Sequence, residues 1–264
     1  MPVLAFELRR QLPGCLTACV IAAVLVAALL GGLYPVFHDA QNEVERILAN
    51  YPPQFLEAFG VHADILTFPG FLSFSAFYLE IVAAVGGFSW GLGAFGRERR
   101  DGCSDFLLTR PCPRASLFAQ KLGACLVSTA LLTIAFAASA VVAVRWGGLD
   151  VDAARLAGAC AAMGGVCLVF TAAGALVGVL APRVRSVSGW ASSAGAVGFV
   201  LAVLPSIADD DKLCVISPFW WFSPAQVMKD GALSGEYLPV AVLCTAELLL
   251  ASFFAYTLRD ARSA

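Results

Sequence analysis

Two glycine-rich strings in the sequence match motifs that carry chemistry in soluble enzymes. Gly87-Phe-Ser-Trp-Gly91 matches the G-x-S-x-G sequence around a nucleophilic serine, and Gly91-Leu-Gly-Ala-Phe-Gly96 matches the G-x-G-x-x-G loop that holds a dinucleotide. Both motifs need a preceding strand, and the first also needs a histidine base. Here both strings lie in a continuous apolar run, away from either histidine of the chain. We interpret Gly87 and Gly91 as a G-x-x-x-G pair that allows two helices to pack closely.

The spacing of the histidines, cysteines, lysines and clustered aspartates does not support a metal site or a nucleotide site. His38 and His62 lack a third ligand at metal-binding spacing, and Asp209-Asp-Asp211 lacks the glycine and glutamate of a calcium loop. The nine cysteines contain no C-x-x-C, so we interpret them as small packing residues. None of the lysines follows a glycine and precedes Ser or Thr, which excludes a phosphate-binding loop. We expect no metal and no cofactor in this chain.

Two carboxylates interrupt apolar runs near their middle. Glu80 and Glu247 would each lie close to the centre of a membrane, where a charge costs about 2.5 to 3.5 kcal/mol. Such residues usually face the interior of a helix bundle or a water-filled path. We therefore name both as candidate residues of a transport pathway, and the alternative is a structural carboxyl group that is protonated or hydrogen-bonded between helices.

The composition places these candidates in an integral membrane protein. Of 264 residues, 59% are hydrophobic and 14% charged, and the mean hydropathy is +0.81. We expect an all-α fold with a single transmembrane domain over residues 1–264. Each span needs roughly 20 apolar residues. Six runs qualify as transmembrane helices, at about 15–36, 69–94, 119–144, 154–180, 187–205 and 238–258.

Basic residues indicate the orientation of the six spans. With an even number of spans both termini lie on one side, and that side with its two loops carries 12 of the 17 Lys and Arg residues. The chain is therefore predicted to be a multi-pass protein of the cell membrane with both termini cytoplasmic. The net charge of −2 gives no reason to expect a nucleic-acid partner.

Three further segments are predicted to lie at the membrane surfaces. Phe6–Arg10 is amphipathic and basic, which favours an N-terminal interfacial helix. Residues 38–67 contain two short amphipathic pieces separated by Pro52-Pro53, and we expect external loop helices there. The aromatic cluster Ile216–Pro224 is typical of an outer aromatic belt.

The longest charged segment of the chain separates the second and third spans, over residues 97–118. Asp101 and Gly102 form a turn signal, Ser104 can cap a helix, and Phe106 to Leu108 supply an apolar face that Pro111 ends. An amphipathic helix between two membrane spans has the character of a docking surface for another protein.

This segment resembles the intracellular loop of permease subunits of type-2 ABC transporters, the exporter-type family. The residues that match the family pattern are Glu98, Gly102, Leu107, Leu108, Arg110, Pro111, Arg114 and Lys121. Cys103 departs from the pattern, since threonine is usual after the glycine, and Cys112-Pro113 is unusual before Arg114. The family also has an N-terminal elbow helix, which Phe6–Arg10 resembles, and Phe253–Asp260 resembles its C-terminal ending.

The resemblance implies that the loop contains a cytoplasmic coupling helix, which seats on a separate ABC ATPase subunit present in two copies. ATP and Mg would then bind to the ATPase, and a second permease half, identical or related, would complete the complex in the lipid bilayer. The residues expected to contact the ATPase are Glu98, Arg99, Arg100, Asp101, Gly102, Ser104, Asp105, Phe106, Leu107, Leu108, Arg110 and Arg114.

The predicted function is therefore that of a permease subunit which couples ATP hydrolysis by its partner to export of a substrate, without enzyme activity of its own. An ATP-independent secondary carrier is the alternative, for which inverted repeats and interrupted helices are typical. An intramembrane enzyme is disfavoured because the sequence has no H-E-x-x-H motif and no serine with an evident base.

Overall fold

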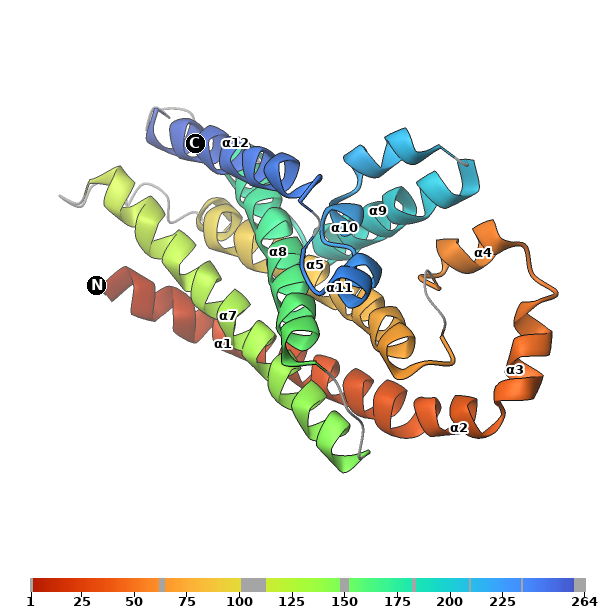
Figure 1. The fold of residues 1–264 in the computed structure, drawn as a ribbon. Coiled ribbons are helices and arrows are strands. Elements are labelled where there is room, and N and C mark those ends of the chain that lie inside the picture. Colours follow the sequence, from red (N-terminus) through yellow and green to blue (C-terminus); the bar gives the residue numbers. More distant parts are fainter. Residues whose placement is uncertain are drawn as a thin grey trace.

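The computed structural model describes residues 2–61, 65–100, 113–147, 152–181, 184–208, 210–233 and 235–258. Over these residues the chain is a bundle of helices without strands (Figure 1). Six helices are long and apolar enough to cross a membrane. The predicted all-α membrane fold is thus confirmed.

Short helices at one end of the bundle connect the first span to the second and the fifth span to the sixth. In chain order the helices are α1 (Pro2–Val26), the π-helix η1 (Ala27–Leu33), α2 (Tyr34–Asp39), α3 (Gln41–Leu48), α4 (Pro53–Ala58), α5 (Phe68–Arg100), α7 (Arg114–Trp146), α8 (Ala153–Leu180), α9 (Val187–Ala208), the 3₁₀-helix η2 (Asp211–Ile216), α10 (Pro218–Trp221), α11 (Pro224–Asp230) and α12 (Leu238–Thr257). Both chain ends lie at the same end of the bundle (Figure 1), here called the termini end. The opposite end, which carries α3, α4, α10 and α11, is called the cap end.

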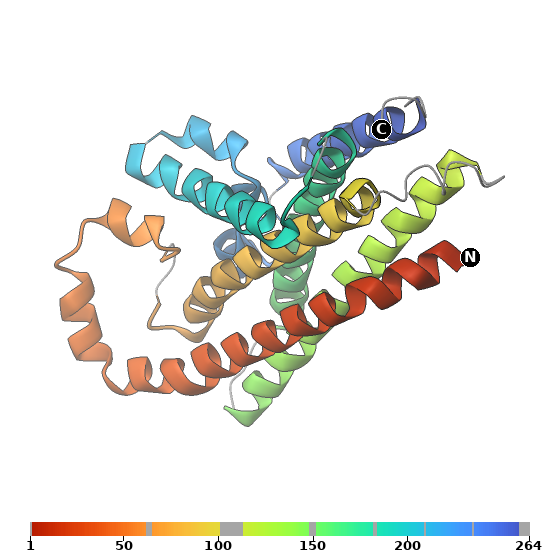
Figure 2. The same ribbon diagram turned by 180° about the vertical axis from the view of Figure 1, so that it is seen from behind.

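The N-terminal segment differs from the expected separate elbow helix. Helix α1 runs without a break from Pro2 to Val26, although Pro13 lies inside it. The side chains of Glu7 and Gln11 are buried, and α1 lies along α7 for much of its length (Figure 2). Because packing against α7 begins in these first turns, Phe6–Arg10 forms the start of the first span instead of a helix of its own.

A π-helical segment joins α1 to α2. In η1 the backbone hydrogen bonds reach five residues back, in place of the four of an α-helix. After it, the buried Tyr34 ring meets Phe68 and Phe71 of α5, with ring centroids 5.1 and 5.4 Å apart. The π-helical segment therefore positions Tyr34 so that its ring holds the first span against the second at the cap end.

Helices α5 and α8 form the centre of the bundle (Figure 2), with 67% and 61% of their spanning residues buried. A Cβ atom added at Gly91 would lie 2.2 Å from the carbonyl oxygen of Thr171, and one at Gly87 would lie 2.3 Å from that of Cys167. Gly174 of α8 is equally close to the carbonyl of Phe88. Only glycine allows these main chains to approach so closely, which confirms the interpretation of the Gly87 and Gly91 pair.

Substitution of Gly91 by alanine should destabilise the bundle. The new methyl group would meet main-chain atoms of α8, so the helices must separate, at a cost of about 1 to 3 kcal/mol. Gly32→Ala is the control, because nothing lies within 4 Å of a Cβ at that position. Thermal unfolding in detergent should give a lower Tm for Gly91→Ala than for Gly32→Ala, and equal Tm values would contradict the packing described here.

Candidate functional site

A buried lysine joins three helices at the termini end. Lys121 of α7 is fully buried, and its Nζ donates a hydrogen bond to the carbonyl oxygen of Ala94 in α5 at 2.5 Å. The same Nζ lies 3.8 Å from Oε1 of Glu7 in α1, whose side chain is also buried. It lies 5.5 Å from the centroid of the Phe95 ring. We call Glu7, Ala94 and Lys121 the polar clamp.

A second set of polar contacts extends the clamp toward the membrane centre. Ser128 Oγ donates to Oε1 of Gln11 at 2.9 Å, and Gln11 Nε2 donates to Sγ of Cys125 at 3.6 Å. Cys15 Sγ in turn donates to the carbonyl oxygen of Ser128 at 3.6 Å. These side chains belong to α1 and α7 only. Together with the Glu7–Lys121 pair they bind α1 to α7 over about two turns.

Aromatic rings bring the last helix into the same unit. Phe118 of α7 packs against Phe95, Phe253 and Tyr256, with centroid separations of 5.0, 5.4 and 5.9 Å. Arg114 Nη1 donates to the carbonyl oxygen of Thr257 at 3.1 Å. The termini end thus holds α1, α5, α7 and α12 together through both polar and aromatic contacts.

The predicted ATPase-contact residues begin and end at this unit. The backbone of Glu98, Arg99 and Arg100 forms the last turn of α5, and Arg114 is the first residue of α7. The other predicted contacts lie outside the described residues; they are Asp101, Gly102, Ser104, Asp105, Phe106, Leu107, Leu108 and Arg110. The two helices that frame this loop are the ones that Lys121 and Ala94 join.

The two candidate pathway carboxylates are not brought together. Glu80 is fully buried, and neither of its oxygens has a hydrogen-bond partner among the described residues. It precedes Gly87 by two helical turns, so it lies on the side of α5 that faces α8. Glu247, by contrast, is exposed on the outer surface of α12.

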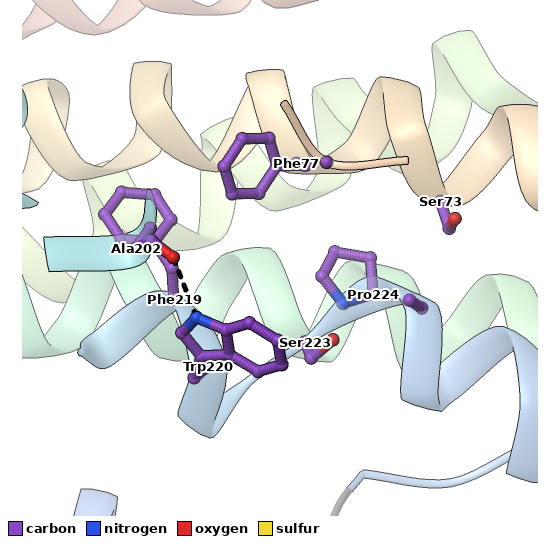
Figure 3. A pocket seen from close by; sticks show the side chains of 9 residues that line it. Ser73, Phe77, Ala202, Phe219, Trp220, Ser223 and Pro224 are labelled. Atoms are coloured by element: carbon purple, nitrogen blue, oxygen red, sulfur yellow. Dashed lines mark hydrogen bonds between the residues drawn. The ribbon is translucent and has the colours of Figure 1, made fainter. Parts of the chain in front are cut away.

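The cap end is filled by aromatic side chains (Figure 3). Phe219 of α10 packs against Phe77 of α5, with centroids 6.0 Å apart, and Trp220 Nε1 donates to the carbonyl oxygen of Ala202 at 2.8 Å. The cavity between them and Ser223 has a volume of only about 10 Å³, roughly the space of one water molecule. The expected outer aromatic belt is therefore wrong for Phe219 and Trp221, which are 2% and 5% exposed, because their rings complete the core.

The bundle also has larger cavities, and two of them lie at the termini end. A cavity of about 460 Å³ lies between α1 and α5, and a second of about 480 Å³ adjoins it near the start of α9. The two cavities share Arg10, Ser89 and Arg97 in their walls. A third cavity, of about 700 Å³, lies between η1 and the C-terminal part of α7, away from the termini end.

Most of the polar clamp was not predicted from the sequence. Glu7 and Gln11 are spaced by four residues, which places them on one face of a helix, and this pattern could have indicated a buried polar face. Lys121 was singled out only through the family pattern. No sequence signal indicated that its partner is the backbone carbonyl of Ala94, because that contact depends on how α5 and α7 cross.

Comparison with known proteins identifies the family. No curated protein matches the chain. A family model described as "ABC-2 family transporter protein" matches residues 15–210, well over half of the 264 residues. The match extends from the first span to the end of α9 and includes the loop between α5 and α7. The chain therefore belongs to the ABC-2 transporter family, as a membrane-spanning permease.

Proposed function

We propose that this permease exports its substrate by using ATP hydrolysis on a separate ABC ATPase subunit, which docks on the loop between α5 and α7. The observation that carries the proposal is the burial of Lys121 between Glu7 and Ala94, about two turns into the helix that follows that loop. A docking loop is useful for coupling only if its two ends are fixed to the helices that must move. The polar clamp supplies that connection.

The polar clamp would make α1, α5 and α7 move together when the loop is displaced. If α5 moved against α7, the Lys121 ammonium would lose its hydrogen bond to the Ala94 carbonyl in a low-dielectric environment, and a hydrogen bond to a charged group contributes about 1.5 to 3 kcal/mol. A push on the loop would therefore displace α1, α5 and α7 together. The cap end would open when Phe77 on α5 moves away from Phe219 on α10.

The assembly follows from what the chain itself lacks. Its sequence has no phosphate-binding loop, so ATP and Mg would bind to two ATPase subunits. Both chain ends lie at one end of the bundle, and the basic residues favour that end as cytoplasmic (Figure 1). Glu247 is exposed in mid-span on α12. A second permease half that covers this face would remove the carboxylate from lipid.

The loop residues can be tested by disrupting their apolar face. Phe106→Asp combined with Leu107→Asp should reduce co-purification of the ATPase subunit from native membranes by about tenfold or more, as expected for loss of apolar anchors at an interface. Ile47→Asp is the matched control, because Ile47 is 57% exposed on α3 at the cap end.

Quantitative mass spectrometry of the tagged chain and an ATPase assay of the eluate provide the measurement. The parent and the Ile47→Asp control should retain the ATPase, and the double variant should lose it. Equal recovery with all three proteins would contradict the assignment of the loop. Recovery of the parent chain without any ATPase would favour the ATP-independent carrier instead.

The clamp can be tested with an uncharged residue of similar length. Lys121→Met leaves Glu7 buried without the ammonium, so we expect a loss of about 3 to 5 kcal/mol of unfolding free energy. Adding Glu7→Gln should recover part of the loss, because the buried carboxylate is then removed. The Tm values of the parent, of Lys121→Met and of the double variant can be compared by thermal unfolding in detergent. A Tm of Lys121→Met equal to that of the parent would show that the clamp does not hold the helices.

Glu80 is proposed as a pathway residue because its carboxyl group is buried without a hydrogen-bond partner among the described residues. Such a group lowers stability, so Glu80→Leu should raise the unfolding free energy by about 1 to 3 kcal/mol. ATP hydrolysis by the assembled complex should fall with the same substitution. A lower Tm in Glu80→Leu would instead assign the carboxyl a structural role.

A further inference from the structure

Three arginines from distant parts of the sequence line one cavity at the termini end. The cavity of about 480 Å³ has Arg10 of α1, Arg97 of α5 and Arg185, two residues before α9, in its wall. The other lining residues are Ser89, Ser186, Val187 and Ser188. Arginine is therefore the only charged residue type among the described residues that line this space.

The chemistry of this wall is suited to a group with several anionic oxygens. Guanidinium groups donate paired hydrogen bonds to phosphate and carboxylate, and serine hydroxyls can donate a further bond each. Val187 begins the long helix α9, whose positive end adds to the same potential. The cavity thus combines three full charges with hydroxyl donors.

The adjoining cavity has a different wall. Its volume of about 460 Å³ lies between α1 and α5, and the large apolar side chains in its wall are those of Ile21, Ile81, Val82, Val85 and Trp90. Arg10 and Arg97 lie in the walls of both cavities. A Cβ placed on Gly93 would lie 3.1 Å from Cζ of Arg97, so this guanidinium folds back by one turn along α5, toward the apolar cavity.

We propose that the two cavities together bind an anionic phospholipid from the leaflet at the termini end. The phosphate group would lie against Arg10, Arg97 and Arg185, and an acyl chain would lie along Ile81 and Val85. A free phosphate or a soluble anion would occupy the arginine cavity only and would leave the apolar one empty. Because the apolar cavity lies within the spans, a lipid can reach it directly from the bilayer. The site does not depend on the proposed ATPase partner.

The headgroup half is tested by native mass spectrometry of the purified chain. Mixed micelles supply equal amounts of phosphatidylglycerol and phosphatidylcholine with the same acyl chains. The parent should retain phosphatidylglycerol preferentially, and a variant with Arg10→Gln, Arg97→Gln and Arg185→Gln should lose that preference by about tenfold or more. Arg9→Gln is the matched control, since Arg9 is exposed beside Arg10 and is not among the residues given for either cavity wall.

The acyl-chain half is tested by filling the apolar cavity. Gly14 lines it, and nothing lies within 4 Å of a Cβ at that position, so Gly14→Leu can enter the space without a main-chain clash. Lipid retention should fall in Gly14→Leu and persist in Gly32→Leu, with Tm values close to that of the parent in both.

Three results would overturn the proposal. The first is equal retention of the two lipids by the parent, and the second is an unchanged preference in the triple arginine variant. The third is displacement of the lipid by inorganic phosphate alone, which would assign the site to a soluble anion. Retention that depends on both the arginines and Gly14 would establish the lipid as the ligand.

Discussion

The approach of α5 to α8 sets the positions of most other elements. Glycine at three points lets the main chains come close enough that a single methyl group would separate them. With these two helices fixed, one face of α5 is directed at α7 and α1, and another at α9, where Gly195 accepts the side chain of Val85. The polar clamp, the contact of Phe77 with Phe219 and the two cavities at the termini end all involve α5.

The two ends of the bundle are held by different kinds of interaction. At the termini end an ion pair and hydrogen bonds join α1, α5 and α7, and these contacts depend strongly on distance and direction. At the cap end aromatic rings around Phe77 and Phe219 provide dispersion contacts, which tolerate sliding and tilting more readily. In the proposed mechanism, the rigid termini end would receive the motion of the ATPase, and the more adjustable cap end would open.

The spans and the glycine contacts could be predicted because each depends on a local pattern. Hydropathy identifies a helix of sufficient length, and small residues four apart identify a face that can approach another helix. The polar clamp could not be predicted, because Glu7, Ala94 and Lys121 come from three helices whose crossing is not encoded in any one segment. The aromatic cluster around Phe219 was misassigned for a related reason, since aromatic side chains are common both in a membrane belt and in a core.

The prediction of a separate elbow helix was wrong because a sequence pattern shows that a helix is amphipathic but does not show what its faces pack against. Phe6–Arg10 has the composition of a surface helix, yet the structure buries Glu7 beside Lys121, within the polar clamp. The predicted contacts at Phe106 and Leu107 remain a prediction, since they lie outside the described residues.

The π-helix η1 has a consequence for how this chain can change in evolution. A π-helical turn holds about one residue more than an α-helical turn. Loss of one residue from Ala27–Leu33 would therefore let the segment relax to an ordinary α-helix with Tyr34 still directed at Phe68 and Phe71. Loss of one residue from Pro2–Val26 would instead turn Tyr34 by about 100°, because the α-helical part of the first span has no extra residue to lose. Deletions in the first span should therefore be tolerated better within η1 than before it.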